Sequence, residues 1–333
     1  MAFVTLKQIA EEVGVSVNTV SRAINDKPDV SKETRQKVLE AAKRLGYVPN
    51  RSALSLRKQK THIVGVIIED NANPFWAEVL RGIESAAKSH GYHVILVNTS
   101  REYQNEVEGI KMLLERRVDG LLIAPNQEKY DDIYQLIEME NIPFVIMGRH
   151  IKEFEKLNIP MIYSNEVKGG YMATQYLIKR GCRRIAFIGA QPYNTASIER
   201  CKGYKKALKE AGIKIDRSLI KTGGIEIKGG YDSTMSLIEK KKQFDGVFAY
   251  NDLMAFGVLK ALRESGLKVP EDVKVIGYDD IPYTTIVTPP LPTIRIKKRE
   301  MGEKAFKILI NKEKKQEVLD IELIARGENH ENL

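Results

Sequence analysis

The 333-residue sequence predicts an α/β body of two similar lobes, each with a parallel doubly wound sheet, preceded by a small all-α helix-turn-helix head. Three observations predict this class. From residue 61, apolar strand-like runs alternate with amphipathic helical runs; the alternation restarts near Ile162; and residues 1–49 contain three short helical patterns instead. Near-continuous apolar strands between helices are typical of parallel sheets covered on both faces.

The head shows the start and stop signals of short helices. Thr5 opens one helix with the spacing of a capping box, Gly14 ends it, Ser16 can cap a second helix, and Ser31 a third. A short helix, a glycine turn and a second short helix define a helix-turn-helix. The capping pattern alone leaves open a generic three-helix bundle with a polar surface.

The outward face of the second helix has side chains suited to DNA bases. Asn pairs with adenine edges, Arg with guanine, and Val contacts the thymine methyl group. The residues expected to read bases are Val17, Asn18, Ser21 and Arg22. Those suited to phosphate contacts are Ser16, Thr19, Asn25, Ser31 and Tyr47, and Thr5 is added to the DNA-binding set.

Charge is concentrated at the N-terminus. Residues 1–60 contain 12 Lys and Arg against 6 Asp and Glu, whereas the rest contains 41 against 38. A basic block before a near-neutral body favours a nucleic-acid-binding head, with a solvated basic face as the alternative. The basic stretch "NRSALSLRKQK" at 50–60 also holds Leu54 and Leu56, which neither a flexible linker nor a buried helix explains.

The strand ends of the body predict a ligand site. Polar or aromatic stretches follow the apolar strands: "EDNANPFW", "NTS", "APN", "MGR", "SN", "YND" and "GYDD". The carboxyl ends of parallel strands border the ligand crevice, here between the lobes, and this mixture suits a sugar. Asp279 and Asp280 are expected on a strand, where neighbours point to opposite faces, so they make a poor acid–base pair.

Several functions lack their sequence signals. There is no phosphate-binding loop, dinucleotide fingerprint or nucleophile elbow, so neither a nucleotide cofactor nor an enzyme is expected. The five histidines do not cluster with carboxylates, and no metal is expected. Two cysteines, no signal-peptide pattern and no long apolar run lead us to expect a cytoplasmic protein without a membrane partner.

At this point the chain resembles the LacI–GalR family of bacterial transcription regulators over nearly its whole length. The stretches that carry the resemblance are "VTLKQIAEEVGVSVNTVSRAIN", "VSKETRQKVLEAAKRLGYVPN", "RRVDGLLI", "GGYMATQYLIKRG", "ERCKGYKKAL", "YNDLMAFGVLKAL", "VPEDVKVIGYDDI" and "TPPLPTI". The resemblance implies a DNA-binding domain at 1–49, a hinge at 50–60 and an effector-binding and dimerisation domain at 61–333. Its N-lobe would comprise 61–161 and 293–318, and its C-lobe 162–292 and 319–330.

The resemblance also explains the leucines. In this family the hinge folds into a short helix on specific DNA, and Leu56 matches a leucine that wedges between base pairs in the minor groove. The hinge residues that it implies contact DNA are Asn50, Ala53, Leu54, Leu56 and Arg57.

The body resembles periplasmic ribose-binding proteins. That likeness implies that Phe75 and Trp76 stack on a sugar ring while polar side chains bind its hydroxyls. The full effector set is Asn73, Phe75, Trp76, Arg149, Arg200, Asn251 and Asp279.

The resulting expectation is a homodimeric repressor of sugar-metabolism genes that binds a pseudo-palindromic operator on double-stranded DNA. A small effector, a sugar or sugar phosphate, would control it allosterically. Three alternatives stay open: control by a purine, control by a partner protein, and a non-regulatory sugar-binding protein. A sugar-acting enzyme is disfavoured, because the sequence has no phosphate-binding loop and no positioned acid–base pair.

Overall fold

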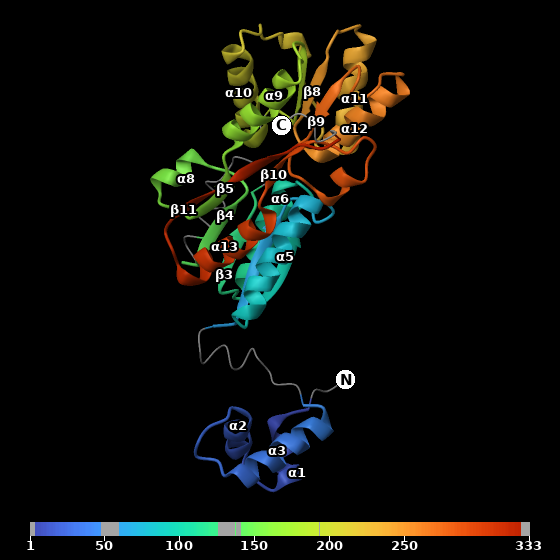
Figure 1. Ribbon diagram of the computed structural model, residues 1–333. Helices are drawn as coiled ribbons and strands as arrows, with labels where there is room; N and C mark the ends of the chain where they lie inside the picture. Colours follow the sequence, from blue (N-terminus) through green and yellow to red (C-terminus); the bar gives the residue numbers. More distant parts are fainter. Residues whose placement is uncertain (1–3, 48–59, 126–136, 138–140, 193, 328–333) are drawn as a thin grey trace. The chain divides into compact units, whose positions relative to one another are not determined.

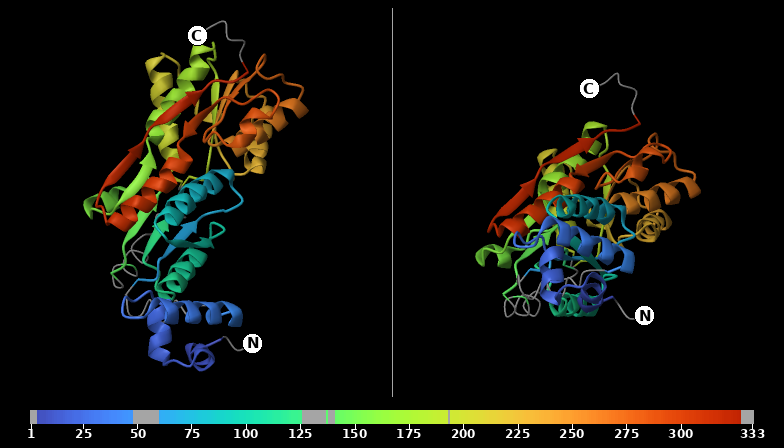
Figure 2. Two further views of the ribbon diagram at one scale, coloured as in Figure 1. Left: turned by 60° about the horizontal axis from the view of Figure 1, so that its bottom comes forward. Right: turned by 90° about the horizontal axis from the view of Figure 1, so that it is seen from below.

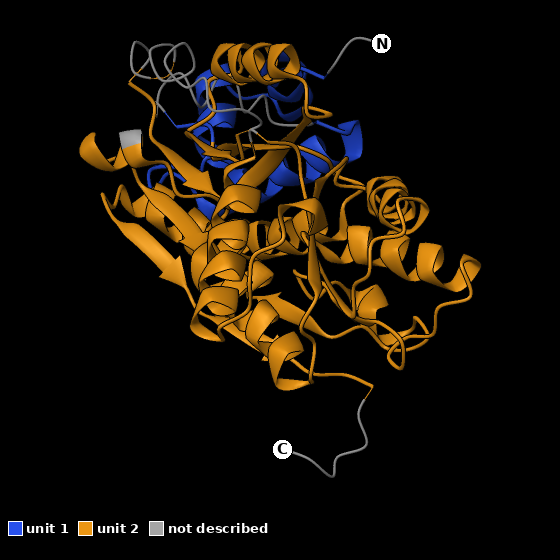
Figure 3. Cartoon of the chain, turned by 90° about the horizontal axis from the view of Figure 1, so that it is seen from above, with its two compact units in different colours: residues 1–61 blue, residues 62–333 orange. Residues whose placement is uncertain are grey.

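The computed structural model describes residues 4–47, 60–125, 137, 141–192 and 194–327 (Figure 1). The chain divides into two compact units, residues 1–61 and 62–333 (Figure 3). In the described part of the chain, no helix is long and apolar enough to cross a bilayer.

The first unit contains three helices with the predicted caps. The Thr5 side chain accepts the backbone N–H of Gln8 in a capping box, and Gly14 ends the helix in the left-handed region that glycine tolerates. Ser16 and Ser31 cap the next two helices. The helices are α1 (Leu6–Val13), α2 (Val17–Ile24) and α3 (Lys32–Leu45).

One small core holds these helices together. Ile9, Val20 and Val38 come from the three different helices and are fully buried. Burying a side chain of this size stabilises the fold by roughly 1.5–3 kcal/mol. Because this core fixes the orientation of α2, Asn18 and Arg22 face solvent.

The N-lobe of the second unit is a six-stranded sheet in the order β11-β5-β4-β3-β1-β2, with all strands parallel. Its strands are β1 (Ile63–Ile68), β2 (His93–Asn98), β3 (Gly120–Ile123), β4 (Phe144–Met147), β5 (Met161–Ser164) and β11 (Gln316–Leu319). Its helices are α5 (Pro74–Ser89), α6 (Tyr103–Glu115), α8 (Lys152–Lys156) and α13 (Lys298–Asn311).

The C-lobe repeats this plan with a four-stranded parallel sheet in the order β7-β6-β8-β9. Its strands are β6 (Ile185–Gly189), β7 (Ile220–Thr222), β8 (Gly246–Ala249) and β9 (Lys274–Ile276). Its helices are α9 (Glu166–Lys179), α10 (Thr195–Glu210), α11 (Ile227–Glu239) and α12 (Asp252–Glu264), with short turns η1 (Arg217–Leu219) and η2 (Pro282–Thr285). The parallel sheet in each of the two lobes confirms the predicted fold class.

An antiparallel pair joins the lobes. Strands β10 (Thr293–Ile296) and β12 (Ile321–Ile324) form this two-stranded sheet. The C-terminal segment, red in Figure 2, runs from the N-lobe sheet to the C-lobe.

Helix pairs in both lobes cross at glycines. A Cβ built at Gly302 of α13 would lie 2.1 Å from the backbone oxygen of Val79 in α5, and one at Gly82 would lie 2.1 Å from that of Arg299. In the C-lobe, Gly170 of α9 and Gly203 of α10 approach each other's backbones in the same way. The absence of a side chain therefore lets each pair pack backbone against backbone, which positions the strand ends that precede α5, α9 and α10.

Three expectations differ from the structure or lie outside it. The expected strand over 273–280 ends at Ile276 as β9, and Asp279 and Asp280 have positive φ values of 106° and 54° in the loop that follows. The stretch "IYQLIEME" at 133–140, which the sequence predicts as an amphipathic helix, lies almost wholly outside the described residues. The expected lobe boundary at 161 falls at the first residue of β5, which belongs to the N-lobe sheet through Ser164.

Candidate DNA-binding helix and effector cleft

The exposed face of α2 carries most of the predicted base-reading residues. Val17 is 45% exposed, Asn18 and Arg22 are exposed, and Ser21 is half-buried. The Nε atom of Arg22 lies 2.6 Å from Oδ2 of Asp29, in the loop before α3. This ion pair lowers the pKa of Asp29, chiefly through the hydrogen bond from Arg22. The guanidinium is therefore held at the surface by a residue that sequence reasoning missed.

The predicted phosphate-contacting residues also serve the fold of the head. Ser16 Oγ accepts the N–H of Thr19 at 3.0 Å, and the Asn25 amide donates to the carbonyl of Ser21 at 2.7 Å. Tyr47 packs partly buried against the core of the head. Each of them still has exposed surface, as do Thr5 and Ser31.

The hinge residues lie outside the described part of the chain. They are Asn50, Ala53, Leu54, Leu56 and Arg57.

The N-lobe wall of the cleft begins where α5 starts. Asn73 caps this helix, and its Oδ1 accepts the N–H of Phe75 at 3.0 Å. The rings of Phe75 and Trp76 pack edge to face, with centroids 4.9 Å apart, and both side chains are buried. A Cβ at Gly148 would lie 2.9 Å from the Trp76 ring, and the φ of +83° there also requires glycine. Glycine at 148 thus makes room for the indole.

Arg149 follows Gly148 at the end of β4 and forms an ion pair with Glu69, which follows β1. Both side chains are nearly buried, at 10% and 13% exposed. Charge-assisted hydrogen bonds of this kind are shorter and stronger than neutral ones. The pair therefore ties together two strand ends in the floor of the N-lobe.

Arg200 organises the facing wall of the C-lobe. Its Nε donates to Oε2 of Glu166 at 2.5 Å, and its Nη1 donates to the carbonyl of Tyr250 at 2.5 Å. The guanidinium carbon lies 3.6 Å from the centroid of the Tyr278 ring. Its Nη2 lies 3.8 Å from Oδ1 of Asp279. A single guanidinium thus connects α9, α10, the end of β8 and the loop after β9.

Asp279 is the carboxylate opposite Arg200. Burial raises the pKa of Asp279 to about 7, although Arg200 and Lys298 oppose the rise. The Nζ atom of Lys298 donates to the backbone carbonyls of Asp279 and Asp280. Asp252 lies nearby, and burial raises its pKa as well. The C-lobe wall therefore holds buried carboxyl groups whose pKa values are raised by burial and by one another's charge.

This environment predicts a pH dependence of stability. The pKa of Asp279 is about 7 in the folded chain and lies near 3.8 when unfolded, so the native state binds more protons between these values. The stabilisation that the native state gains from its raised Asp279 pKa is therefore complete below about pH 4. This part of the free energy of unfolding is lost as the pH rises towards 7. Wild type should lose stability over this window relative to Asp279→Asn in urea titrations at a series of pH values. Parallel curves for the two proteins would contradict the assignment.

Asn251 has a structural position at the edge of the cleft. Its Oδ1 caps α12 by accepting the N–H of Met254 at 2.8 Å, and its amide donates to the carbonyl of Ile225 at 3.0 Å. Asn251 is a predicted ligand residue, but its role as the N-cap of α12 accounts equally well for an amide side chain at this position.

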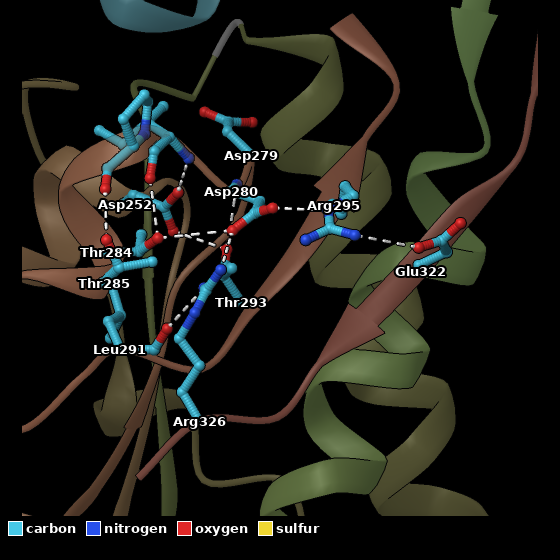
Figure 4. A network of polar contacts seen from close by, with 12 residues as sticks. Asp252, Asp279, Asp280, Thr284, Thr285, Leu291, Thr293, Arg295, Glu322 and Arg326 are labelled. Atoms are coloured by element: carbon cyan, nitrogen blue, oxygen red, sulfur yellow. Dashed lines mark hydrogen bonds and ion pairs between the residues drawn. The ribbon is translucent and has the colours of Figure 1, made fainter.

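Asp280 points away from Asp279 and belongs to a second network (Figure 4). Its carboxylate accepts from Nε of Arg295 at 2.6 Å and from Nη2 of Arg326 at 2.5 Å. Arg295 also lies 3.4 Å from Glu322 on the paired strand. The effector-facing loop is thereby fastened to the strands that join the lobes. The side chains of Asp279 and Asp280 thus point in different directions, as predicted. The reason differs, because the two residues lie in a loop with positive φ values and not on a strand.

Arg101 links the two lobes through ion pairs. Arg101 follows β2, binds Asp70 of the N-lobe at 2.8 Å, and also binds Glu226, which precedes α11 in the C-lobe. The lobes are therefore held together by a direct electrostatic contact in addition to the β10–β12 pair.

A cavity of about 730 Å³ opens between the lobes beside these groups. Arg149, Ser164 and Glu166 line its inner end, and Leu157, Ile198 and Val318 are exposed apolar residues along it. Of the seven predicted effector residues only Arg149 lines this cavity, and the other six are at most 9% exposed. These six lie buried around it at the strand ends of the two lobes, and their contact with a ligand stays a prediction.

Several residues of the cleft were not predicted. Glu69 and Tyr278 stand in the strand-end stretches "EDNANPFW" and "GYDD", so strand-end position was a signal for both. Glu166 and Lys298 are the first residues of α9 and α13, and no comparable sequence signal marks either of them. Within the described ranges, no group of three or more His, Cys, Asp or Glu side chains is arranged to hold a metal ion.

The described folds define a class of protein in which a helix-turn-helix head is joined to a two-lobed ligand-binding body. Residues 5–50 match the model of "Bacterial regulatory proteins, lacI family", and residues 61–329 match "Periplasmic binding proteins and sugar binding domain of LacI family". The chain belongs to the LacI family of DNA-binding transcription regulators.

Curated relatives match nearly the whole chain. The HTH-type transcriptional regulator RegA of Clostridium saccharobutylicum is 36% identical over 97% of this chain and 98% of its own. The ribose operon repressor of Escherichia coli K12 is 37% identical over 92% of each. The HTH-type transcriptional repressor PurR of Histophilus somni strain 129Pt is 36% identical over 97% of this chain and 98% of its own.

Solved structures agree with these matches. A lac repressor dimer bound to operator and the anti-inducer ONPF superposes with a TM-score of 0.87 at 27% identity, covering 98% of both chains. A complex of the transcriptional regulator CelR with cellobiose gives a TM-score of 0.72 at 31% identity, covering 97% of this chain and 99% of that one.

Proposed function

We propose that this chain is a dimeric repressor of sugar-metabolism genes whose operator affinity is set by a sugar bound between the lobes. The observation that carries the proposal is the Arg200 centre. A guanidinium and a facing carboxylate, Asp279, stand at the strand ends where a hydroxyl pair can bridge them. We test it by titrating the protein onto operator DNA with and without candidate sugars.

Each protomer reads one half-site of a pseudo-palindromic operator. Sugar binding changes the angle between the lobes and so the separation of the two hinges at 50–60. The free-energy cost of folding the hinges on DNA then changes with their separation. We further propose that the chain is not an enzyme, because the charged and amide side chains of the cleft are engaged in ion pairs and helix caps and offer no activated nucleophile.

The exposed position of Arg22 on α2 predicts a role in base readout. Arg22→Ala should weaken binding to the true operator by about 1–3 kcal/mol and relax specificity at one base pair, because a bidentate guanine contact is lost. Fluorescence anisotropy with single-base operator variants measures this. Lys7→Ala, an exposed change on α1, is the control. An equal loss on operator and random DNA would mean that Arg22 touches only phosphate.

Leu56 in the hinge is predicted to act as a wedge in the minor groove. Leu56→Ala should weaken specific binding while leaving salt-dependent non-specific binding nearly intact, because an apolar wedge contributes only when the DNA is bent. Gel phasing should show less bending of the operator. Unchanged bending would reject the assignment of Leu56 to the minor groove.

A purine effector is the second candidate. Phe75 and Trp76 offer apolar ring surface, and relatives named PurR are as similar to this chain as the ribose repressor is. A thermal-shift panel of sugars and purine bases separates the two, since a ligand at 100 times its Kd adds roughly 2.7 kcal/mol of stability.

A further inference from the structure

The positive side chains of the cleft already have carboxylate partners. Three arginines at the strand ends of the two lobes are involved. The pairs are Arg149 with Glu69, Arg200 with Glu166 and Asp279, and Arg101 with Asp70 and Glu226. None of these three guanidinium groups is therefore available to a ligand without competition from a protein carboxylate.

The charge balance of this cluster is negative or neutral. Lys298 is its fourth cation, and it donates to the backbone carbonyls of Asp279 and Asp280. Against these four cations stand the five carboxyl partners and Asp252, which is completely buried. Burial raises the pKa of Asp252 and of Asp279, and even with a proton on both, four carboxylates stand against the four cations and the cluster is neutral.

A phosphate group would meet two penalties in this cluster. Its two negative charges would lie among carboxylates, and like charges in a poorly solvated site repel strongly. To reach Arg149 or Arg200, it would have to displace Glu69 or Glu166. Glu166 is only 8% exposed, so the displaced carboxylate would remain buried without its cation.

Hydroxyl groups meet neither penalty. A hydroxyl donates one hydrogen bond and accepts others, so it can donate to Asp279 and accept from Arg200 while the two remain close. Their closest nitrogen and oxygen are 3.8 Å apart, longer than a good hydrogen bond, which leaves both with capacity for a ligand. The cluster is thus suited to groups that bridge ion pairs and unsuited to groups that replace one partner.

We propose that the cleft binds an uncharged carbohydrate and discriminates against its phosphate ester. This inference rests on the proposed sugar-controlled regulation and narrows its ligand from sugars in general to unphosphorylated ones. The carboxylates are the groups that disfavour the phosphate ester. Glu69 does so most directly, because it already binds the Arg149 guanidinium that a phosphate would need.

The cavity beside the cleft is the place where a phosphate could otherwise be held. His150, Lys152 and Lys202 line it, but His150 lies 3.3 Å from Glu155, and Lys202 is paired with Glu199. Lys152 is exposed to solvent, where a single charge is screened. The cavity therefore does not offer a phosphate site to offset the repulsion in the cleft.

The test uses the full chain and matched ligand pairs. A thermal-shift panel of mono- and disaccharides, each beside its phosphate ester, and of purine bases selects the strongest ligand. Isothermal titration calorimetry then compares that ligand with its partner. We expect the parent sugar to bind at least tenfold more tightly than its ester. An ester that binds as tightly or more tightly overturns the inference but leaves sugar-controlled regulation standing.

A variant makes the comparison specific. Glu69→Gln keeps the shape of the side chain and releases Arg149, so the preference for the parent sugar should shrink by several-fold. Glu84→Gln, an exposed change on α5, is the control and should leave the preference unchanged. An unchanged preference in Glu69→Gln overturns the role of Glu69. If only purine bases stabilise the chain, the carbohydrate assignment itself is overturned. If a sugar binds but leaves operator affinity unchanged, the proposed function fails while the charge selectivity stands.

Discussion

Replacing Arg200 by alanine is expected to destabilise the body by about 3–5 kcal/mol, because removing one partner of a buried ion pair leaves the other charge uncompensated. Glu166 and Asp279 both lose their cation, and the Tyr250 carbonyl loses a donor. Urea denaturation followed by circular dichroism measures the change.

Two companion variants make this result interpretable. Arg217→Ala removes an exposed arginine of the same lobe and should change stability by no more than about 0.5 kcal/mol. Arg200→Lys keeps the charge but loses the planar group that lies over Tyr278, so it should fall between wild type and alanine. A loss below 1 kcal/mol in Arg200→Ala would show that Arg200 does not hold the C-lobe wall together.

The Asp279→Asn variant should separate effector control from DNA binding. Asparagine has nearly the same shape, but it no longer supplies a charged acceptor for ligand hydroxyls, which should cost about 1.5–3 kcal/mol of effector affinity. Operator affinity without effector should stay unchanged, because the head folds around its own core. Effector titrations of operator binding measure both quantities.

The matched control for Asp279→Asn is Asp272→Asn, an exposed change in the same lobe. It should respond to effector like wild type. If Asp279→Asn retained a full effector response, the ligand would not contact this carboxylate and the Arg200 centre would be a structural feature alone.

The elements that sequence predicted are those governed by local rules. Thr5, Ser16 and Ser31 cap helices because a side-chain oxygen satisfies an N–H a few residues away, and this relation is visible in the sequence. The strand ends were found for the same reason, since an apolar run followed by polar residues marks them. Both kinds of signal lie within a few residues.

The interactions that sequence did not predict join distant residues. Glu69 and Arg149 are 80 positions apart, and Glu166 and Arg200 are 34 apart, so only the fold brings each carboxylate to its cation. The loop at 279–280 was misjudged because apolar residues continue to Tyr278, while the chain leaves the sheet after Ile276. The carboxylate partners, which decide the ligand chemistry, therefore had to come from the structure.

The central claim is that effector binding in the cleft and operator binding by the head are coupled by a single coupling free energy. Reciprocity requires that operator DNA alter effector affinity by the same factor by which effector alters operator affinity. Calorimetric titration of the effector into the full chain, with and without saturating operator, measures this directly. The account predicts two different affinities whose ratio equals the shift seen in DNA binding. Identical affinities in the two titrations would contradict it and leave the cleft as a ligand site without a regulatory role.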